Sequence, residues 1–286
     1  MHIFGTGKPA AAVLDAPEPV KPTGRTRALV VGIDKYKCGS NLGCCVADAQ
    51  LVADMLVARF GFEAGQVRML TDERATRGAM LDRMEWLRAD AAPGDELAGW
   101  HSGHGTQSAT RNWAGEPDGL DEVLVPYDFD WDNEDTWVMD DDVNRIFGSL
   151  PEGVLCNLVF DTCHSEGLLR GNPAPPKGTP RFLEPPADIA WRIAAAKKAA
   201  IPLRRLVEPA AMNVGFVSAC RSDETAAEDA ALGHGALTYY LTQVLRERPD
   251  LPLDELVAAA SIDIHAGGYS QHPQCAGARS GKPFLG

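Results

Sequence analysis

Short apolar runs that alternate with amphipathic segments constrain the fold of this chain more than any other feature. Residues 28–33 are uniformly apolar and end at Asp34, and residues 154–160 are almost as apolar. Residues 46–60 instead carry apolar side chains at helical spacing. Apolar runs of this length suit strands buried on both faces, and strands alternating with helices favour a parallel sheet. We therefore predict an α/β fold with a mostly parallel sheet of about six strands and helices on both faces. Further predicted strands are 67–70, 96–100 and 214–218, and further predicted helices are 76–89, 141–147, 236–246 and 253–262.

Charge and cysteine content narrow the class of protein. The chain has 27 basic and 40 acidic residues, a formal net charge of −13, so we expect no nucleic-acid or membrane partner and easier approach by basic peptides. No apolar run reaches the roughly 18 residues of a membrane-spanning helix. The seven cysteines show no repeated CxxC spacing, which disfavours a disulfide framework or a zinc ribbon. We expect a cytoplasmic monomer.

The chain divides into an N-terminal extension and one large domain. Residues 1–26 carry four prolines and no periodicity, whereas a regular pattern runs through residues 27–286. Residues 170–212 interrupt that pattern with a proline-rich start and a basic, alanine-rich stretch. Such a segment is either a functional or mobile linker or, over residues 187–200, a solvated surface helix.

Two predicted strands end in segments rich in reactive side chains. One runs into His101-Ser102-Gly103-His104-Gly105, and the other into Asp161-Thr162-Cys163-His164-Ser165. Because parallel strands bring their carboxyl ends to one edge of a sheet, these segments are expected to meet. An imidazole beside a thiol can take its proton, and the thiolate can attack a carbonyl carbon. We predict Cys163 as nucleophile, His104 as base, and the amides of Gly105 and Cys163 as donors to an oxyanion.

Three other interpretations remain open from the residues alone. A lone cysteine at a strand end is usually a small buried hydrophobe, and a lone histidine is usually a polar group with a partner. The same fold could also be a binding or signalling module whose Cys–His pair is silent. A third possibility is a metal site built from Cys44, Cys45, His101, His104 and Cys163.

At these two segments the chain resembles the caspase-like clan, and within it the metacaspases and their prokaryotic relatives. Ser102-Gly103-His104-Gly105 resembles the catalytic-histidine loop, and residues 161–165 resemble the catalytic-cysteine loop. The resemblance continues in family order from Arg27 to the C-terminus. It implies a large-subunit-like part over 27–169, a linker over 170–212 and a small-subunit-like part over 213–286. The Gln-Ala-Cys signature of true caspases is absent. The further matching stretches are 41–49, 118–122 followed by Pro126 and Asp128, 218–226 and 271–274.

The resemblance implies an endopeptidase that cleaves after Arg or Lys. It assigns the pocket for the basic side chain to Asp48 and Asp161, with Ser102 and Cys45 also lining it. Two carboxylates in a semi-enclosed pocket would bind a cation by charge-assisted hydrogen bonds and repel an acidic side chain. Without that pocket, Asp48 would cap or solvate a helix and Asp161 would orient its loop. Self-cleavage in the linker is also implied, but its basic residues do not single out a site: Lys177, Arg181, Arg192, Lys197, Lys198, Arg204 and Arg205.

The resemblance requires no cofactor but implies a calcium site at Asp121, Asp140 and Asp141, since oxygen ligands suit Ca²⁺. The fourth family position corresponds to Arg170, which cannot ligate a cation. The run Asp140-Asp141-Asp142 can instead be an acidic cluster at a helix N-terminus.

Two further departures concern the catalytic loops. Glu166 replaces a glycine of the family pattern, and His101 and His164 are rival histidines. We choose His104 because Gly105 follows it.

Overall fold

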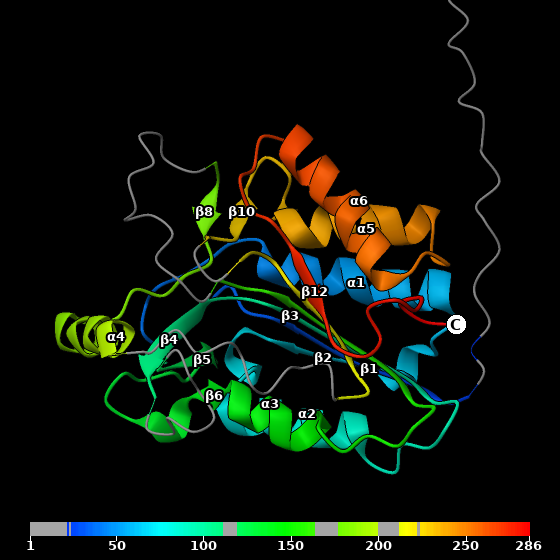
Figure 1. The fold of residues 1–286 in the computed structure, drawn as a ribbon, viewed down its shortest axis with the longest axis horizontal. Helices are drawn as coiled ribbons and strands as arrows, with labels where there is room; N and C mark the ends of the chain where they lie inside the picture. Colours follow the sequence, from blue (N-terminus) through cyan, green and yellow to red (C-terminus); the bar gives the residue numbers. More distant parts are fainter. Residues whose placement is uncertain (1–21, 23, 111–118, 164–176, 200–211, 222–223) are drawn as a thin grey trace, which may run out of the picture.

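The computed structural model describes residues 22, 24–110, 119–163, 177–199, 212–221 and 224–286. Its centre is a six-stranded sheet in the order β12-β9-β7-β3-β1-β2 (Figure 1). The strands that lie side by side from β2 to β9 are all parallel, and only β12 is antiparallel to its neighbour. The predicted fold class is confirmed. The strands are β1 (Thr26–Gly32), β2 (Val67–Thr71), β3 (Glu96–Ser102), β7 (Leu155–Asp161), β9 (Gly215–Ser218) and β12 (Gln274–Ala276).

Burial explains why the central strands could be predicted. All seven residues of β1 and all seven of β3 are buried, because helices cover both faces of the sheet. Strands in that position need apolar side chains on both sides, which produces continuous apolar runs. The edge strand β12 has only three residues and none of them is buried, so it leaves no such pattern.

Two groups of helices cover the two faces of the sheet (Figure 1). Helices α1 (Cys45–Phe60), α5 (Ala236–Glu247) and α6 (Leu253–Ala266) contribute to one hydrophobic core. Helices α2 (Arg77–Arg88) and α3 (Asp140–Phe147) contribute to a second core on the opposite face. Burial of apolar area on both faces is the main source of stability for such a sheet. Short 3₁₀ turns lie at Ala64–Gln66, Asp72–Arg74 and Glu134–Thr136.

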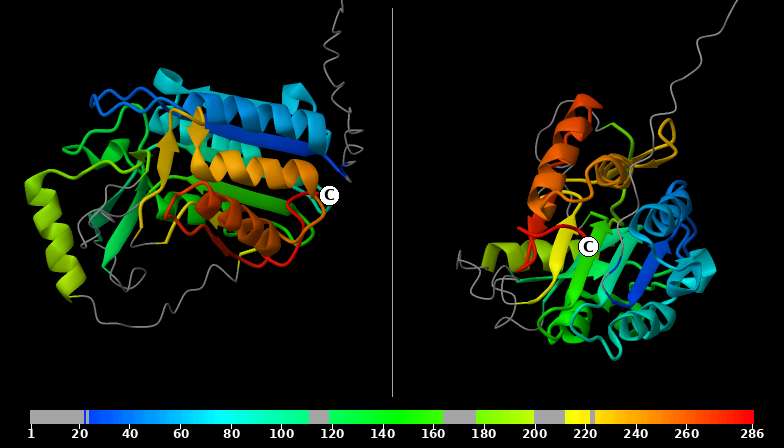
Figure 2. Two further views of the ribbon diagram at one scale, coloured as in Figure 1. Left: turned by 90° about the horizontal axis from the view of Figure 1, so that it is seen from above. Right: turned by 90° about the vertical axis from the view of Figure 1, so that its right-hand side faces the viewer.

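Two small antiparallel sheets extend the fold beyond the carboxyl ends of the central strands (Figure 2). One contains β4, β5 and β6, and the other contains β8, β10 and β11. Helix α4 (Ala187–Ala199) packs on the first of them through Ile189 and Ile193. Their bounds are β4 (Gly105–Ala109), β5 (Leu120–Leu124), β6 (Val138–Met139), β8 (Thr179–Pro180), β10 (Ala227–Asp229) and β11 (His234–Gly235).

The stretch 170–212 therefore contains regular structure. Helix α4 corresponds to the surface helix that the sequence allowed over 187–200, and β8 pairs with β10. Residues 170–176 and 200–211 lie outside the described residues, as do 1–21 and 23 of the extension. In the part of the chain that the structure describes, no helix has the length and hydropathy needed to cross a bilayer.

Candidate active site

The two predicted catalytic segments lie side by side at one edge of the central sheet. Strands β3 and β7 are parallel neighbours, and Ser102 at the end of β3 pairs with Asp161 at the end of β7. His104 follows the first strand and Cys163 follows the second, with side chains almost fully buried. The topology therefore brings together residues that are far apart in the sequence.

The surroundings of His104 fix its tautomer. Its Nε2 lies 3.1 Å from the carbonyl oxygen of Ser40, and because a carbonyl only accepts hydrogen bonds, Nε2 carries the proton. Nδ1 then bears a lone pair, and it is buried without a hydrogen-bond partner. Tyr36 holds the loop, since its Oη accepts a hydrogen bond from the His104 amide at 2.8 Å. A side chain at Gly103 would collide with that Tyr36 oxygen.

Burial keeps the His104 imidazole neutral at physiological pH. It lowers the pKa of His104 to about 4, although the nearby carbonyl of Ser40 and backbone of Arg181 favour the charged form. The Arg181 guanidinium lowers this pKa further. A neutral imidazole with a free lone pair on Nδ1 can accept a proton.

The thiol of Cys163 points to the loop that follows β9. Its Sγ donates a hydrogen bond to the carbonyl oxygen of Glu224 at 3.0 Å, and Cys220 donates to the same oxygen at 3.4 Å. The Glu224 carboxylate is in turn held by His272, with 2.6 Å between Oε1 and Nδ1. Cys163 and Cys220 are close enough that the Cys163 thiol raises the pKa of Cys220.

A carbonyl oxygen of the chain itself lies between the two segments. The carbonyl oxygen of Arg181 accepts hydrogen bonds from the Gly105 amide at 3.0 Å and from the Cys163 amide at 3.2 Å. Two fixed N–H donors aimed at one carbonyl oxygen are what a tetrahedral oxyanion needs. These are the two amides that the sequence analysis selected as oxyanion donors.

The backbone on both sides of Arg181 is extended and paired with the protein. On one side, β8 pairs with β10, and the Arg181 amide donates to Ala226 at 2.9 Å. On the other side, the Leu183 amide donates to the carbonyl of Gly105 at 2.9 Å, and the Thr106 hydroxyl donates to the carbonyl of Leu183 at 2.8 Å. The segment 179–183 therefore connects the two small sheets and crosses the site as an added strand.

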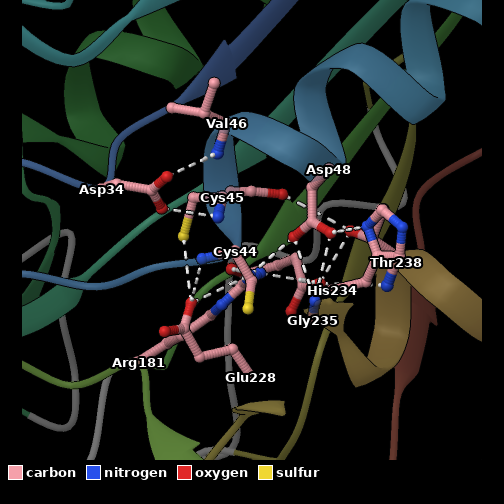
Figure 3. A network of polar contacts seen from close by, with 12 residues as sticks. Asp34, Cys44, Cys45, Val46, Asp48, Arg181, Glu228, His234, Gly235 and Thr238 are labelled. Carbon is pink, nitrogen blue, oxygen red and sulfur yellow. Dashed lines mark hydrogen bonds and ion pairs between the residues drawn. The ribbon is translucent and has the colours of Figure 1, made fainter. Parts of the chain in front are cut away.

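The Arg181 side chain fills a buried acidic pocket beside this carbonyl (Figure 3). Its Nη2 lies 2.6 Å from Asp48 and 3.5 Å from Glu228, and its Nη1 lies 2.9 Å from Asp161. The Arg181, Asp48 and Asp161 side chains are all 0% exposed. Both carboxylates that the resemblance assigned to a pocket for a basic side chain thus contact a guanidinium.

Other groups hold each carboxylate in place. Asp48 accepts hydrogen bonds from the Gly235 amide at 3.1 Å and from His234 Nδ1 at 3.0 Å. Asp161 accepts hydrogen bonds from the amide and the hydroxyl of Thr238, at 3.0 and 2.7 Å. Buried carboxylates need such donors because an unpaired buried charge is costly.

The charged groups in the pocket strongly affect one another's pKa. Burial raises the pKa of Asp161, an effect that the Arg181 cation opposes. Burial alone would lower the pKa of Arg181, but Asp161 and its other anionic neighbours raise it well above its usual value. The guanidinium is therefore fully charged, and its removal would leave several buried carboxylates without a cation.

Ser102 and Cys45 lie behind the carboxylates. The hydroxyl of Ser102 is 3.4 Å from that of Thr238, which itself binds Asp161. The thiol of Cys45 is 3.6 Å from Glu228, and burial raises its pKa far above the usual range. Both side chains are fully buried.

The three aspartates of the predicted calcium site lie near the small sheet that contains β5. Asp121 is in β5, and Asp140 and Asp141 begin α3 directly after β6, which pairs with β5. Burial raises the pKa of Asp140 to about 7, with further contributions from Glu122, Asp141 and Asp121. Asp140 Oδ1 is buried without a hydrogen-bond partner, a situation that suits a cation ligand. Arg170 lies outside the described residues, as do His164 and Glu166.

The alternative metal site is not assembled. Across the residues that the structure describes, only Asp34, Cys45 and Glu228 bring three ligand-type atoms within 4.8 Å of one another. That group shares a single member, Cys45, with the five side chains considered from the sequence. His101 is buried within β3, ahead of the loop that carries His104.

Sequence reasoning missed several residues of the site. It placed Arg181 among seven basic linker residues without selecting it, and it did not single out Glu228, Glu224 or Thr238. Glu228 lies two residues beyond the matching stretch 218–226, so the motif itself gave no signal. The acidic character of Glu228 itself was the only indication that the sequence offered.

Comparison with known proteins identifies the family. A family model described as metacaspase, peptidase C14 domain, matches residues 26–171, more than half of the chain. The chain belongs to the metacaspase family. The match includes both strand-end segments of the site and ends close to the predicted boundary of the large-subunit-like part.

Curated metacaspases from fungi are similar over most of the chain. The metacaspase-1 of Cryptococcus neoformans is 28% identical over 288 residues, covering 88% of this chain and 62% of the relative. The metacaspase-1 of Schizosaccharomyces pombe is 29% identical, covering 88% and 67%. That of Kluyveromyces lactis is 36% identical over 154 residues, covering 51% and 35%. This metacaspase thus spans roughly two thirds or less of the length of these relatives.

A solved structure supports the same fold. A crystal structure of a protein from Geobacter sulfurreducens matches 92% of this metacaspase, and 99% of that chain is covered. The TM-score is 0.68 and the sequence identity 22%, so the likeness concerns the fold.

Proposed function

We propose that this metacaspase is a cysteine endopeptidase that cleaves peptide bonds after Arg or Lys. The observation that carries the proposal is the position of Arg181. Its carbonyl oxygen lies between the amides of Gly105 and Cys163 while its side chain contacts Asp48 and Asp161. A substrate residue before a scissile bond must satisfy both conditions at once.

The proposed reaction is acyl transfer through Cys163. His104 takes the thiol proton on Nδ1, and the thiolate attacks the carbonyl carbon of the basic residue. The amides of Gly105 and Cys163 stabilise the oxyanion. The intermediate collapses to a thioester as His104 protonates the leaving amine, and water then hydrolyses the thioester with His104 as base.

The same arrangement supports self-cleavage of the linker. The bond between Arg181 and Phe182 is the one whose carbonyl accepts from both amides, so we assign it as the autoprocessing site. Until that segment leaves, Arg181 occupies the pocket and excludes other substrates. Cleavage in cis is therefore expected to precede cleavage of other peptides.

Three further properties belong to the proposal. Asp121, Asp140 and Asp141 are proposed to bind Ca²⁺, supported by the buried, unpaired Asp140 oxygen. Their oxygens do not all lie within 4.8 Å of one another, so the proposal requires the side chains to move together around the ion. A cytoplasmic location is supported by the seven cysteines, all of which are free thiols. A monomeric state is also proposed.

A catalytically silent binding module is the second candidate function. The thiol of Cys163 donates to Glu224 in the described conformation, an arrangement that such a module could also have. It would bind basic peptides in the acidic pocket without cleaving them. The two candidates differ in whether a product is formed.

Reporter peptides ending in Arg, Lys or Asp distinguish the candidates. The full chain is incubated with each peptide, with and without calcium, beside the variant Cys163→Ala and the control Cys275→Ala. We expect release of the reporter after Arg and Lys by the native chain and by Cys275→Ala, and none by Cys163→Ala. Release after Asp alone, or equal release by Cys163→Ala, contradicts the proposal.

A further inference from the structure

The acidic pocket has a third carboxylate whose place is distinct from those of Asp48 and Asp161. Glu228 lies in β10, outside both strand-end segments, and its side chain is 7% exposed. Its Oε1 accepts a hydrogen bond from the Gly43 amide at 2.8 Å, and its Oε2 accepts one from the Cys44 amide at 3.2 Å. These amides precede α1, where a carboxylate is favoured by the helix dipole (Figure 3). Glu228 is therefore held rigidly against the pocket.

The pocket contacts the guanidinium at its two ends. Nη1 is paired with the Asp161 carboxylate at 2.9 Å and donates to the carbonyl oxygen of Asp161 at 3.2 Å. Nη2 is shared by Asp48 at 2.6 Å and Glu228 at 3.5 Å. Nε is buried without a hydrogen-bond partner. Recognition thus uses the two terminal nitrogens that only an arginine side chain provides.

A lysine side chain cannot reproduce these contacts. It ends in a single ammonium group, and one nitrogen cannot occupy the Nη1 and Nη2 positions at once. An ammonium group placed beside Asp161 would be separated by a gap from the other two carboxylates, Asp48 and Glu228. Leaving a buried carboxylate without its charged partner is costly, and here two of them would share that loss.

We infer that Glu228 is a specificity-determining residue that makes this pocket select arginine over lysine before the cleaved bond. The inference rests on the proposed function for its kinetic consequence, but its structural part concerns the pocket alone. Asp48 and Asp161 attract any basic side chain. Asp48 already faces the Nη2 position, and Glu228 adds a second carboxylate there, which strengthens the requirement for a donor at that position. A lysine would lose the hydrogen bond of Nη2 to Asp48 and the ion pair of Nη2 with Glu228. Losing one hydrogen bond to a charged group corresponds to a factor of roughly 10 to 100 in an equilibrium, so the discrimination expected of the two carboxylates together is at least about tenfold.

Kinetic discrimination is the first test. The ratio of kcat/KM for peptides ending in Arg and Lys is measured for the native chain, for Glu228→Gln and for Glu63→Gln. Glu63 is exposed, so Glu63→Gln removes one negative charge, as Glu228→Gln does, but at a position outside the pocket. We expect a ratio of about 10 or more in the native chain and in Glu63→Gln. In Glu228→Gln the ratio falls because cleavage after Arg slows while cleavage after Lys changes little, and the remaining contact of Asp48 with Nη2 keeps the ratio above 1.

Thermal unfolding tests the pocket without catalysis. In a Cys163→Ala background the linker stays intact, so Arg181 remains in the pocket and can itself be replaced to measure how the pocket binds arginine and lysine. We expect Arg181→Lys to lower Tm by about 2 °C or more. This loss should shrink when Glu228→Gln is also present, because the two residues are coupled.

The two measurements separate the possible failures. A ratio that Glu228→Gln leaves unchanged, with additive effects on Tm, overturns the inference while the proposed function stands. If no peptide is cleaved but the Tm effects are coupled, the proposed function fails and the role of Glu228 stands. If Glu228→Gln unfolds the protein, Glu228→Asp replaces it, since a shorter carboxylate withdraws from Nη2 and should lower the ratio in the same direction.

Discussion

The carbonyl oxygen of Arg181 lies 3.2 Å from the amide nitrogen of Cys163, so the bond that follows Arg181 in the linker is adjacent to the proposed nucleophile. We predict that the chain cleaves itself between Arg181 and Phe182. Incubation of the purified chain should yield fragments 1–181 and 182–286, identified by intact mass.

Arg181→Gln should slow this self-cleavage at least about tenfold, because glutamine lacks the cation that the buried carboxylates require. Arg192→Gln is the matched control, since Arg192 is an exposed linker arginine that pairs with Asp188 across one turn of α4. Unchanged fragments from Arg181→Gln, or loss of the fragments in Arg192→Gln, would show that another bond is the substrate.

Gly235 sets the width of the acidic pocket. A Cβ at this position would collide with Arg181 Nη1 and with Asp161 Oδ2. Forcing an extra carbon into a packed site typically costs 1–3 kcal/mol, so we predict that Gly235→Ala lowers kcat/KM for Arg peptides by roughly tenfold. Gly65→Ala serves as control because a Cβ there meets open space. Equal rates for the two variants would mean that arginine does not bind where Arg181 lies.

The elements that position the site could be predicted because burial leaves its mark on the sequence. Strands β1, β3 and β7 are covered on both faces and therefore read as apolar runs. Parallel pairing then places His104 and Cys163 at one edge without further information. The edge strand β12 and the two-residue strand β8 are too short and too exposed to leave such a mark.

The identity of the pocket's occupant could not be predicted. Seven basic linker residues besides Arg170 are equivalent in the sequence, and only the three-dimensional path of the chain selects Arg181. That path depends on pairing of β8 with β10 and of Leu183 with Gly105, contacts between residues with no local pattern in common. Glu228 was missed for the same reason, because its partners Gly43 and Cys44 are distant in the sequence.

The buried imidazole of His104 makes the stability of the protein depend on pH. Its pKa is lowered from 6.5 to about 4 by burial, so the folded state favours the neutral form. The resulting stabilisation is complete above pH 6.5 and is lost as the pH falls towards 4. By linkage it amounts to about 3 kcal/mol.

Urea unfolding at pH 7 and pH 4.5 measures this dependence. His104→Gln should lose less stability than the native chain between the two pH values, because glutamine does not titrate. His265→Gln, which removes an exposed histidine, should behave like the native chain. Identical pH dependence in the native chain and in His104→Gln would refute a buried neutral imidazole at this position.

Asp140 carries an electrostatic cost in the absence of a cation. Burial and the nearby Glu122, Asp141 and Asp121 raise its pKa to about 7, so above neutral pH the folded state holds a charge that it disfavours. We predict that Asp140→Asn stabilises the protein in EDTA at pH 8 by about 1–3 kcal/mol.

Calcium should reverse the order of stability of the native chain and Asp140→Asn. It should raise the Tm of the native chain, because a cation bound to the folded state stabilises it, and it should leave Asp140→Asn unchanged. Asp132→Asn, at an exposed aspartate, is the matched control. A calcium-induced rise in Tm that persists in Asp140→Asn would place any calcium site elsewhere.

Leu183 fixes the segment that follows the proposed scissile bond. Its side chain is 5% exposed and belongs to the hydrophobic core that contains α2 and α3, and both of its backbone polar groups are paired with Gly105 and Thr106. Leu183→Asp would bury a carboxylate without a cation, so the segment should leave the site, and self-cleavage should slow by roughly tenfold or more. Glu184→Gln changes an exposed neighbouring side chain and should cleave at the native rate. The rates are measured by the appearance of fragment 182–286, and an unaffected rate in Leu183→Asp would mean that the bond reaches Cys163 without support from the following residues.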